Sequence, residues 1–223
     1  MTRTKGAEVH PSIVSGAALP LGHCYDDGVS EFASQSVLRA VFLDRDGVLN
    51  EKMPEGQYVA RWEEFRVLPG VPEALRRLNE AGVRVIVVSN QRGIARGLYT
   101  AAEVAAIHAN FQQLLHGAGA HIDGFFICPH DKGECNCRKP LPGLFEQAVV
   151  QFPEITAATS AMIGDSLSDI EFGYWLGMRT VFVEGDRERR KPGAEAAAEL
   201  ADWRCASLPE AVDALLAPRS ATA

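Results

Sequence analysis

The chain of 223 residues has no apolar stretch of the length that crosses a bilayer, so we expect no membrane span. It has no excess of basic residues: 22 Lys and Arg stand against 29 Asp and Glu, and the formal net charge of -7 disfavours a general nucleic-acid binder. Two common Gly-rich phosphate-binding patterns, Gly-x-x-x-x-Gly-Lys-Ser/Thr and Gly-x-Gly-x-x-Gly, are missing. With no internal repeat, this length suits one domain with short appendages.

Cysteine is scarce and unevenly placed. The chain has five cysteines, an odd number, and three of them lie within residues 128–137. Such clustering is typical of metal ligation in a reducing compartment and does not suggest a disulfide framework. We therefore expect a cytoplasmic location.

Both ends of the chain have the composition of appendages. Residues 1–38 are rich in Gly, Ala, Ser and Pro, and we interpret them as a flexible extension or as the product of a start codon assigned too far upstream. Their weakly apolar patch, residues 13–21, is interrupted by proline, so we do not interpret it as a signal peptide. Residues 39–218 form the predicted domain, and 219–223 a disordered tail.

Between these ends, apolar runs alternate with amphipathic stretches, which predicts an α/β fold with a mainly parallel sheet. The helix expected over residues 100–116 has its core face at Val104, Ile107, Phe111, Leu114 and Leu115, and we expect His108 and His116 at the surface. The predicted strands are 40–43, 83–88, 122–127, 161–163 and 180–183. The other predicted helices are 72–80, 142–152, 167–176 and 208–216.

The first apolar run, Ala40 to Leu43, stops at Asp44, and a second carboxylate follows at Asp46. Ligands of open α/β sheets bind beyond the carboxyl ends of the strands. Two carboxylates spaced in this way can share a cation and divide the roles of nucleophile and proton donor. A strand end followed by an ordinary Asp-Gly turn has the same pattern. Residues further along the chain must therefore distinguish a catalytic carboxylate pair from such a turn.

Polar residues also follow two later strands. Ser89 and Asn90 come after the second apolar run, and Asp165 follows Gly164 after the fourth. A hydroxyl and an amide at a strand end can donate hydrogen bonds to a phosphoryl oxygen, and Arg92 or Arg96 can add charge. A Ser-Asn pair by itself often only caps a helix or forms a turn.

The segment Cys-Pro-His-Asp-Lys-Gly-Glu-Cys-Asn-Cys-Arg-Lys-Pro, residues 128–140, is the densest in reactive side chains. Three thiolates and an imidazole suit a closed, structural Zn²⁺ site with all four positions filled by protein. Because this loop has almost no apolar residues, the metal would replace the missing core. Arg138 and Lys139 follow directly, so Zn²⁺ would also hold two cations in place. The four predicted ligands are Cys128, His130, Cys135 and Cys137.

With these segments in this order, residues 39–216 resemble the haloacid dehalogenase superfamily of aspartyl phosphatases. The resemblance implies a three-layer, Rossmann-like sandwich with a minimal cap and a zinc-binding loop. Within the superfamily, Phe-Leu-Asp-Arg-Asp-Gly, Ser-Asn-Gln-x-Gly-Ile-Ala-Arg-Gly and Cys-Pro-His…Cys-x-Cys-Arg-Lys-Pro are similar to the D-glycero-D-manno-heptose 1,7-bisphosphate phosphatases. The histidinol-phosphate phosphatases share the Asp-x-Asp and zinc segments. The short spacing of His130 and Cys135 is similar to this second group.

The resemblance implies a role for each motif residue. Asp44 attacks phosphorus, and Asp46 protonates the leaving oxygen, for which its pKa in the substrate complex must be raised. Mg²⁺ is held by Asp44, by the backbone carbonyl of Asp46 and by Asp165, while Ser89 and Lys139 hold the transferring oxygens. The residues expected to recognise the rest of the substrate are Asn90, Gln91, Arg92, Arg138 and Tyr58.

Two alternatives come from other classes. A zinc-organised binding module without catalysis would not need the intact set Asp44, Asp46, Lys139 and Asp165. A nucleic-acid end phosphatase is disfavoured by the acidic charge balance. We therefore expect a monomeric enzyme that acts on a small phosphorylated molecule and binds neither nucleic acid nor membrane.

Overall fold

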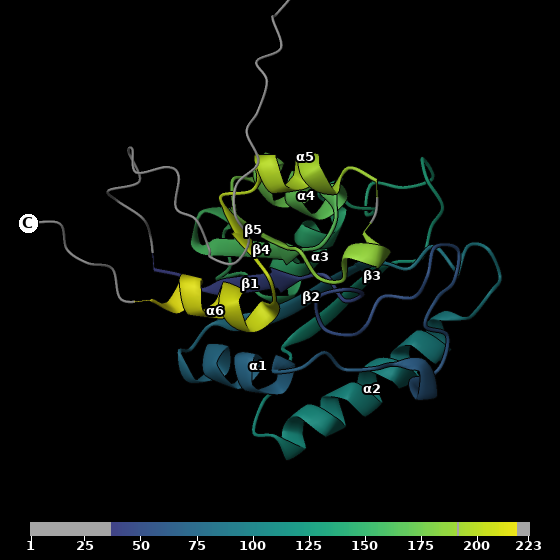
Figure 1. Ribbon diagram of the computed structural model, residues 1–223, viewed down its shortest axis with the longest axis horizontal. Helices are drawn as coiled ribbons and strands as arrows, with labels where there is room; N and C mark the ends of the chain where they lie inside the picture. Colours follow the sequence, from purple (N-terminus) through teal and green to yellow (C-terminus); the bar gives the residue numbers. More distant parts are fainter. Residues whose placement is uncertain (1–36, 191, 218–223) are drawn as a thin grey trace, which may run out of the picture.

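The computed structural model describes residues 37–190 and 192–217 (Figure 1). The flexible extension expected over residues 1–38 therefore lies outside the described part of the chain, apart from Val37 and Leu38. The tail expected at 219–223 also lies outside it. None of the helices in the described ranges is long and apolar enough to cross a membrane.

A six-stranded sheet with the order β3-β2-β1-β4-β5-β6 forms the centre of the fold. Every neighbouring pair is parallel, as the alternating pattern predicts. In the middle of the sheet, Val41 pairs with Val85 on one side and with Ala161 on the other. The strands are β1 (Ala40–Leu43), β2 (Arg84–Asn90), β3 (Gly124–Cys128), β4 (Ser160–Gly164), β5 (Arg179–Val183) and β6 (Trp203–Cys205).

Helices cover both faces of this sheet, which confirms the predicted three-layer sandwich. Figure 1 shows α1, α2 and α6 on one face and α3, α4 and α5 on the other. Their bounds are α1 (Val71–Glu80), α2 (Ala101–Gly117), α3 (Gly143–Gln151), α4 (Leu167–Leu176), α5 (Ala194–Leu200) and α6 (Leu208–Leu216).

The central strand β1 has no exposed side chain, because it is covered on both faces. Successive side chains of a strand point to opposite faces, so Val41 and Leu43 join the core under α1 and α2, whereas Ala40 and Phe42 join the core under α3. The ring of Phe42 packs 5.5 Å from that of Phe145 in α3. This double burial fixes the strand that ends at Asp44.

The structure differs from the sequence prediction mainly near the C-terminus. Helix α5 and strand β6 were not predicted, and neither were the 3-10 helices Trp62–Glu64, Ala157–Thr159 and Arg187–Arg189. Strand β6 has only three residues at the sheet edge, too few for a visible periodicity. Strand β3 starts later than predicted, because the backbone of Ile122 bonds to the side chain of Gln112 instead.

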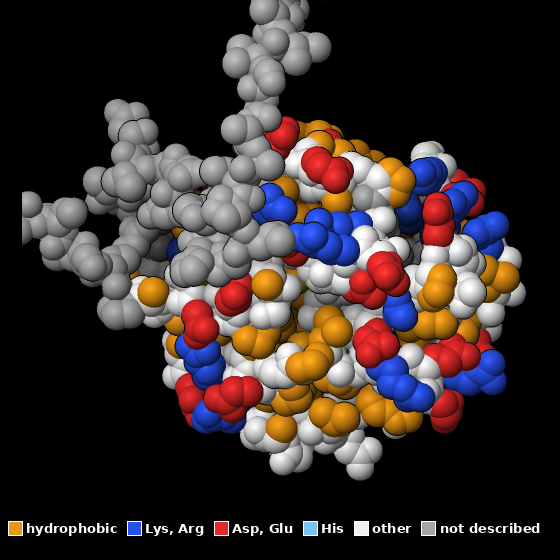
Figure 2. All heavy atoms as spheres, in the orientation of Figure 1, with side chains coloured by type: hydrophobic (Ala, Val, Ile, Leu, Met, Phe, Trp, Pro, Cys, Tyr) orange, Lys and Arg blue, Asp and Glu red, His pale blue; other side chains and the backbone are white. Residues whose placement is uncertain are grey.

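Acidic and basic side chains are interspersed on the face shown in Figure 2, and neither sign forms a large continuous area there. The expectations of a monomer, of a cytoplasmic location and of no nucleic-acid partner stay predictions.

Candidate active site

Acidic side chains meet at the carboxyl ends of β1 and β4. These two strands lie side by side, and the strand order reverses there, which is where ligands of such sheets bind. Asp44 follows β1, Asp165 follows β4, and Asp169 lies one turn into α4. One carboxylate oxygen of each lies within 4.8 Å of the others, and all three side chains are buried.

Lys139 brings a positive charge into this cluster. Its Nζ lies 2.9 Å from Oδ1 of Asp44 and 2.6 Å from Oδ1 of Asp169, and it donates to the carbonyl of Val88 at 2.6 Å. Burial lowers the pKa of Lys139, but the charges of Asp169 and Asp44 outweigh it and raise the pKa above its usual value. The lysine is therefore a fixed ammonium beside the expected nucleophile.

Asp46 faces a different set of donors. Arg45 Nη2 donates to both of its carboxylate oxygens, at 3.0 and 2.9 Å, and Asn50 and Gln91 donate at 3.0 and 3.1 Å. Burial raises the pKa of Asp46, but the charge of Arg45 and these hydrogen bonds together lower it by more. The pKa of Asp46 therefore lies below its ordinary value. The carboxylate is held ionised here, the reverse of what a general acid in a substrate complex requires.

Gln91 connects Asp46 to Ser89. Its Nε2 also donates to Ser89 Oγ at 2.8 Å, and its Oε1 accepts from the hydroxyl of Tyr99 at 2.6 Å. Burial raises the pKa of Tyr99 to about 12, so its hydroxyl keeps its proton and donates. The side chain of Gln91, expected to contact substrate, is thus buried and bonded within the protein.

Asn90 also uses its side chain inside the protein. Its Nδ2 donates to the carbonyl of Lys139 at 3.1 Å, and its Oδ1 accepts from the backbone N–H of Lys139 at 3.0 Å. These two bonds join the end of β2 to the end of the cysteine-rich loop. The amide of Asn90 therefore acts on the residue that reaches Asp44.

The remaining residues expected to contact substrate are Arg92, Tyr58 and Arg138. Arg92 donates to Asp131 at 2.5 Å, and Arg96 donates to the hydroxyl of Tyr58 at 3.4 Å. Arg138 is half-buried, and its Nη1 is buried without a hydrogen-bond partner. Such an atom leaves one guanidinium donor available to an anion.

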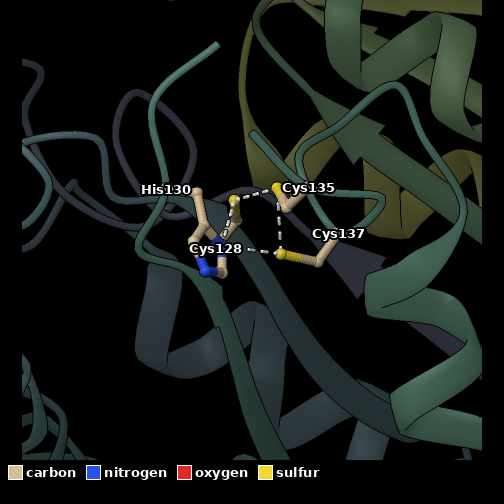
Figure 3. Close-up of side chains that lie close together, drawn as sticks. All are labelled: Cys128, His130, Cys135 and Cys137. Atoms are coloured by element: carbon tan, nitrogen blue, oxygen red, sulfur yellow. Dashed lines mark hydrogen bonds between the residues drawn. The ribbon is translucent and has the colours of Figure 1, made fainter. Parts of the chain in front are cut away.

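The predicted metal ligands of the cysteine-rich loop converge (Figure 3). The Sγ of Cys135 lies 3.5 Å from Cys128 Sγ and 3.3 Å from Cys137 Sγ, and His130 Nδ1 lies 3.3 Å from Cys137 Sγ. All four ligand atoms lie within 4.8 Å of one another. Tetrahedral Zn²⁺ with Zn–S bonds of ~2.3 Å would place its ligands ~3.8 Å apart. The cluster therefore fits Zn²⁺.

The acidic cluster fits a hard cation. Its donors are carboxylate oxygens, the type that Mg²⁺ prefers, and they come from the ends of β1 and β4 and from the first turn of α4. Lys139 and Ser166 already bond to the two oxygens of Asp169, which makes Asp44 and Asp165 the better candidates for metal ligands. This agrees with the carboxylate pair that the motifs predict.

Two further residues at Asp165 were missed by the sequence analysis. The Nζ of Lys52 makes an ion pair with Asp165 Oδ2, and both side chains are almost buried. Gly47, with φ of 100°, packs so closely that a Cβ atom there would lie 2.2 Å from Asp165 Oδ2. The Asp-Gly pair after β1 was a visible signal for Gly47, whereas nothing near Lys52 in sequence indicated its partner.

Two predictions about α2 are wrong. Leu114, expected on the core face, is 40% exposed, whereas Leu115 is buried. His108 is buried and not on the surface: its ring stacks on Phe125 with centroids 4.3 Å apart, and its Nε2 has no hydrogen-bond partner. Burial, with a contribution from the charge of Arg45, lowers the pKa of His108 to about 3, so the ring is neutral. His116 is exposed, as expected.

Known proteins resemble the chain in sequence and in structure. Residues 38–177 match the haloacid dehalogenase-like hydrolases. A D-glycero-alpha-D-manno-heptose-1,7-bisphosphate 7-phosphatase from Mycobacterium tuberculosis is 42% identical over 60% of this chain and 70% of its own length. A D-glycero-beta-D-manno-heptose-1,7-bisphosphate 7-phosphatase from Bordetella bronchiseptica is 34% identical over 69% and 84%, respectively.

A solved structure extends this comparison to the fold. The crystal structure of D,D-heptose 1.7-bisphosphate phosphatase from B. bronchiseptica, complexed with magnesium and phosphate, superposes with a TM-score of 0.71 and 32% identity. It covers 80% of this chain and 98% of its own. Sequence and fold thus agree, and the chain belongs to the haloacid dehalogenase-like hydrolases, as a phosphoric monoester hydrolase.

Proposed function

We propose that the chain is a Mg²⁺-dependent phosphatase that converts D-glycero-D-manno-heptose 1,7-bisphosphate to heptose 1-phosphate through an aspartyl phosphate on Asp44. The observation that carries this proposal is the placement of Asp44 at the end of β1, between the ammonium of Lys139 and the carboxylate of Asp165. A carboxylate held in this way can attack a phosphorus atom while neighbouring cations bind the phosphoryl oxygens.

Lys139 and Ser89 bind the transferring group in this mechanism. The ammonium is fixed by Asp169 and by the carbonyl of Val88, so little reorganisation is needed when the phosphoryl oxygens arrive. The Ser89 hydroxyl is oriented by Gln91 Nε2, which leaves its own proton free to be donated. Both groups stabilise the negative charge on the phosphoryl oxygens in the transition state.

Asp46 supplies and then removes the proton. To act as an acid it must leave the donors Arg45, Asn50 and Gln91, which hold it ionised. Rotation toward the leaving oxygen would break those bonds, and the nearby phosphate dianion would raise the pKa of Asp46, since like charges disfavour ionisation. After the alcohol departs, the ionised carboxylate can take a proton from the attacking water.

Each metal has a separate task. Asp44, Asp165 and the Asp46 carbonyl would hold Mg²⁺, which would supply charge that offsets the repulsion between carboxylate and phosphate. Zn²⁺ in the cluster of three cysteines and His130 would be structural, because all four positions are filled by protein. Zinc should therefore remain with the purified protein at about one equivalent per chain, whereas Mg²⁺ should exchange.

The relatives and the Gly-Ile-Ala-Arg-Gly segment support a heptose bisphosphate as the substrate. The relative with 42% identity acts on the alpha anomer and the one with 34% identity on the beta anomer, which favours the alpha form. Histidinol phosphate is the second candidate, because the loop between His130 and Cys135 is short, as in the histidinol branch.

Turnover on a substrate panel tests this proposal. The panel contains both anomers of the heptose bisphosphate, histidinol phosphate and a 5′-phosphorylated oligonucleotide, with the Asp44→Asn protein as the blank for contaminating phosphatase. We expect kcat/KM for a heptose bisphosphate to exceed the other values by orders of magnitude. A higher kcat/KM for histidinol phosphate would move the chain to the histidinol branch, and no turnover above the blank would refute the proposal.

A further inference from the structure

Among the charged residues described at the acidic cluster, Lys52 alone has no role in the proposed mechanism. It lies in the segment between β1 and α1, and its backbone is anchored on both sides. Arg189 Nη1 donates to the Lys52 carbonyl at 2.5 Å, and the preceding residue, Glu51, donates its N–H to Arg66 at 2.7 Å. The side chain can therefore move while the backbone stays in place.

The ammonium of Lys52 contacts Oδ2 of Asp165, one of the two carboxylates assigned to the metal. Lys52 and Asp165 are only 11% and 7% exposed, so water screens their attraction weakly. The backbone of Gly47 packs against the same oxygen. A Cβ atom added to Gly47 would lie only 2.2 Å from Asp165 Oδ2. There is thus little room for an ammonium and a divalent cation at this carboxylate together.

A second location for the ammonium exists nearby. Lys52 and Asp165 line a cavity of about 200 Å³ whose other charged lining residues are Glu51, Glu184, Asp186, Arg189 and Arg190. Glu184 is bonded to Arg190 at 2.9 Å, but Glu51 lies 4.0 Å from its nearest cation, Arg189, and is half-exposed. A lysine displaced from Asp165 would therefore meet a weakly paired carboxylate without leaving the cavity.

We propose that Lys52 is a built-in counter-cation of Asp165 that Mg²⁺ must displace, so that this lysine raises the Mg²⁺ concentration needed to fill the site. The inference rests on the magnesium site of the proposed function. The physical basis is repulsion: a unit charge held within a few ångströms of a divalent cation, away from bulk water, opposes its binding. Before the metal binds, the Lys52 ammonium also offsets part of the negative charge of the carboxylate cluster.

Calorimetric titration of Mg²⁺ into substrate-free, zinc-loaded protein tests this. Lys52→Met removes the charge and keeps most of the chain length, and Lys52→Gln is a second neutral variant. We expect both to bind Mg²⁺ about tenfold more tightly than the parent, which corresponds to ~1.4 kcal/mol. The matched control, Lys132→Met, removes an exposed lysine from the cysteine-rich loop and should leave the affinity unchanged. Unchanged or weaker binding in both folded Lys52 variants would overturn the inference.

Two further measurements separate the inference from its basis. Asp165→Asn should nearly abolish Mg²⁺ binding; if it keeps the parental affinity, the magnesium site itself is wrongly assigned. If it loses affinity while the Lys52 variants gain none, only the role of Lys52 fails. Reductive methylation should modify Lys52 several times faster at saturating Mg²⁺ than in magnesium-free buffer, with Lys132 as the internal reference. An equal rate for Lys52 in the two buffers contradicts displacement.

Discussion

The side chain of Asn90 holds the backbone of Lys139 through two hydrogen bonds, one donated and one accepted, at 3.1 and 3.0 Å. This pair links strand β2 to the loop that carries the predicted zinc ligands. The Nζ of the same lysine lies 2.9 Å from Asp44. Asn90 is thus placed to position Lys139 against Asp44, the proposed nucleophile.

Asn90→Ala should lower kcat/KM by about 10²-fold, the scale of small misplacements in active sites, while bound zinc is retained. Gln112→Ala is the matched control, because Gln112 makes the same two-bond contact with the backbone of Ile122. We expect both variants to lose about 1–3 kcal/mol of stability, and only the first to lose activity. Steady-state kinetics and denaturant unfolding measure the two effects; equal activity in the two variants would refute the positioning role.

The cysteine-rich loop should affect catalysis through the same lysine. Cys137 lies two residues before Lys139 and is buried beside the start of α3, where Gly143 donates to the carbonyl of Asn136 at 3.0 Å. Cys137→Ser should therefore lower kcat/KM by about 10²-fold at temperatures at which the domain stays folded. Lys139→Ala should have a similar effect, and the double variant should be little worse than either. Additive losses in this double-mutant cycle would show that the metal acts elsewhere.

Gly47 should be irreplaceable for a reason separate from its backbone conformation. Gly47→Ala places a methyl group against the carboxylate of Asp165, so we expect weaker Mg²⁺ binding together with a stability loss of about 1–3 kcal/mol. Gly82 has a similar positive φ of 71°, but nothing lies within 4 Å of the added atom. Gly82→Ala should therefore lose stability and keep the parental Mg²⁺ affinity, as measured by calorimetry. A parental affinity in Gly47→Ala would contradict the close packing at Asp165.

His108 should make the protein sensitive to acid. Its pKa is about 3 in the folded protein and about 6.5 when unfolded, so between these values the unfolded chain binds the extra proton. The free energy of unfolding that the neutral ring of His108 contributes is complete above pH about 6.5. It is lost as the pH falls toward 3, by at most about 1.4 kcal/mol per pH unit. Denaturant unfolding of His108→Phe from pH 7 to 5 should show a shallower loss than the parent. The exposed control, His116→Gln, should follow the parent; identical slopes in all three would disprove the assignment.

Much of the fold could be predicted because its central elements are strongly patterned. Strand β1 is wholly apolar and ends at a carboxylate, and that break locates the carboxyl edge of the sheet. Helix α5 was missed although its alanine-rich sequence favours a helix, because it is only seven residues long and follows a charged stretch, residues 184–191. His108 was misplaced although it lies four residues after Val104, on the core face of α2, because imidazole is polar enough to suggest solvent.

The chemistry of the site was less predictable than its position. Asp44 and Asp165 follow β1 and β4, which are neighbours in the sheet, so their proximity followed from the strand order, whereas Lys139 reaches Asp44 from the cysteine-rich loop. The contacts of Asp46 with Gln91, and of Lys52 with Asp165, depend on loop conformations that no local pattern encodes. The internal roles of Asn90 and Gln91 were hidden for the same reason, since an amide suits a substrate as well as a backbone.

The central claim is that Asp44 becomes covalently phosphorylated. The most direct measurement is mass spectrometry of protein quenched in acid during turnover of a heptose bisphosphate. We predict one added phosphoryl group on the peptide that contains Asp44, lost on treatment with hydroxylamine and absent from the Asp44→Asn protein, whose turnover falls by orders of magnitude although it remains folded. Substantial turnover by Asp44→Asn, with no phosphorylated peptide trapped in the parent, would contradict the account.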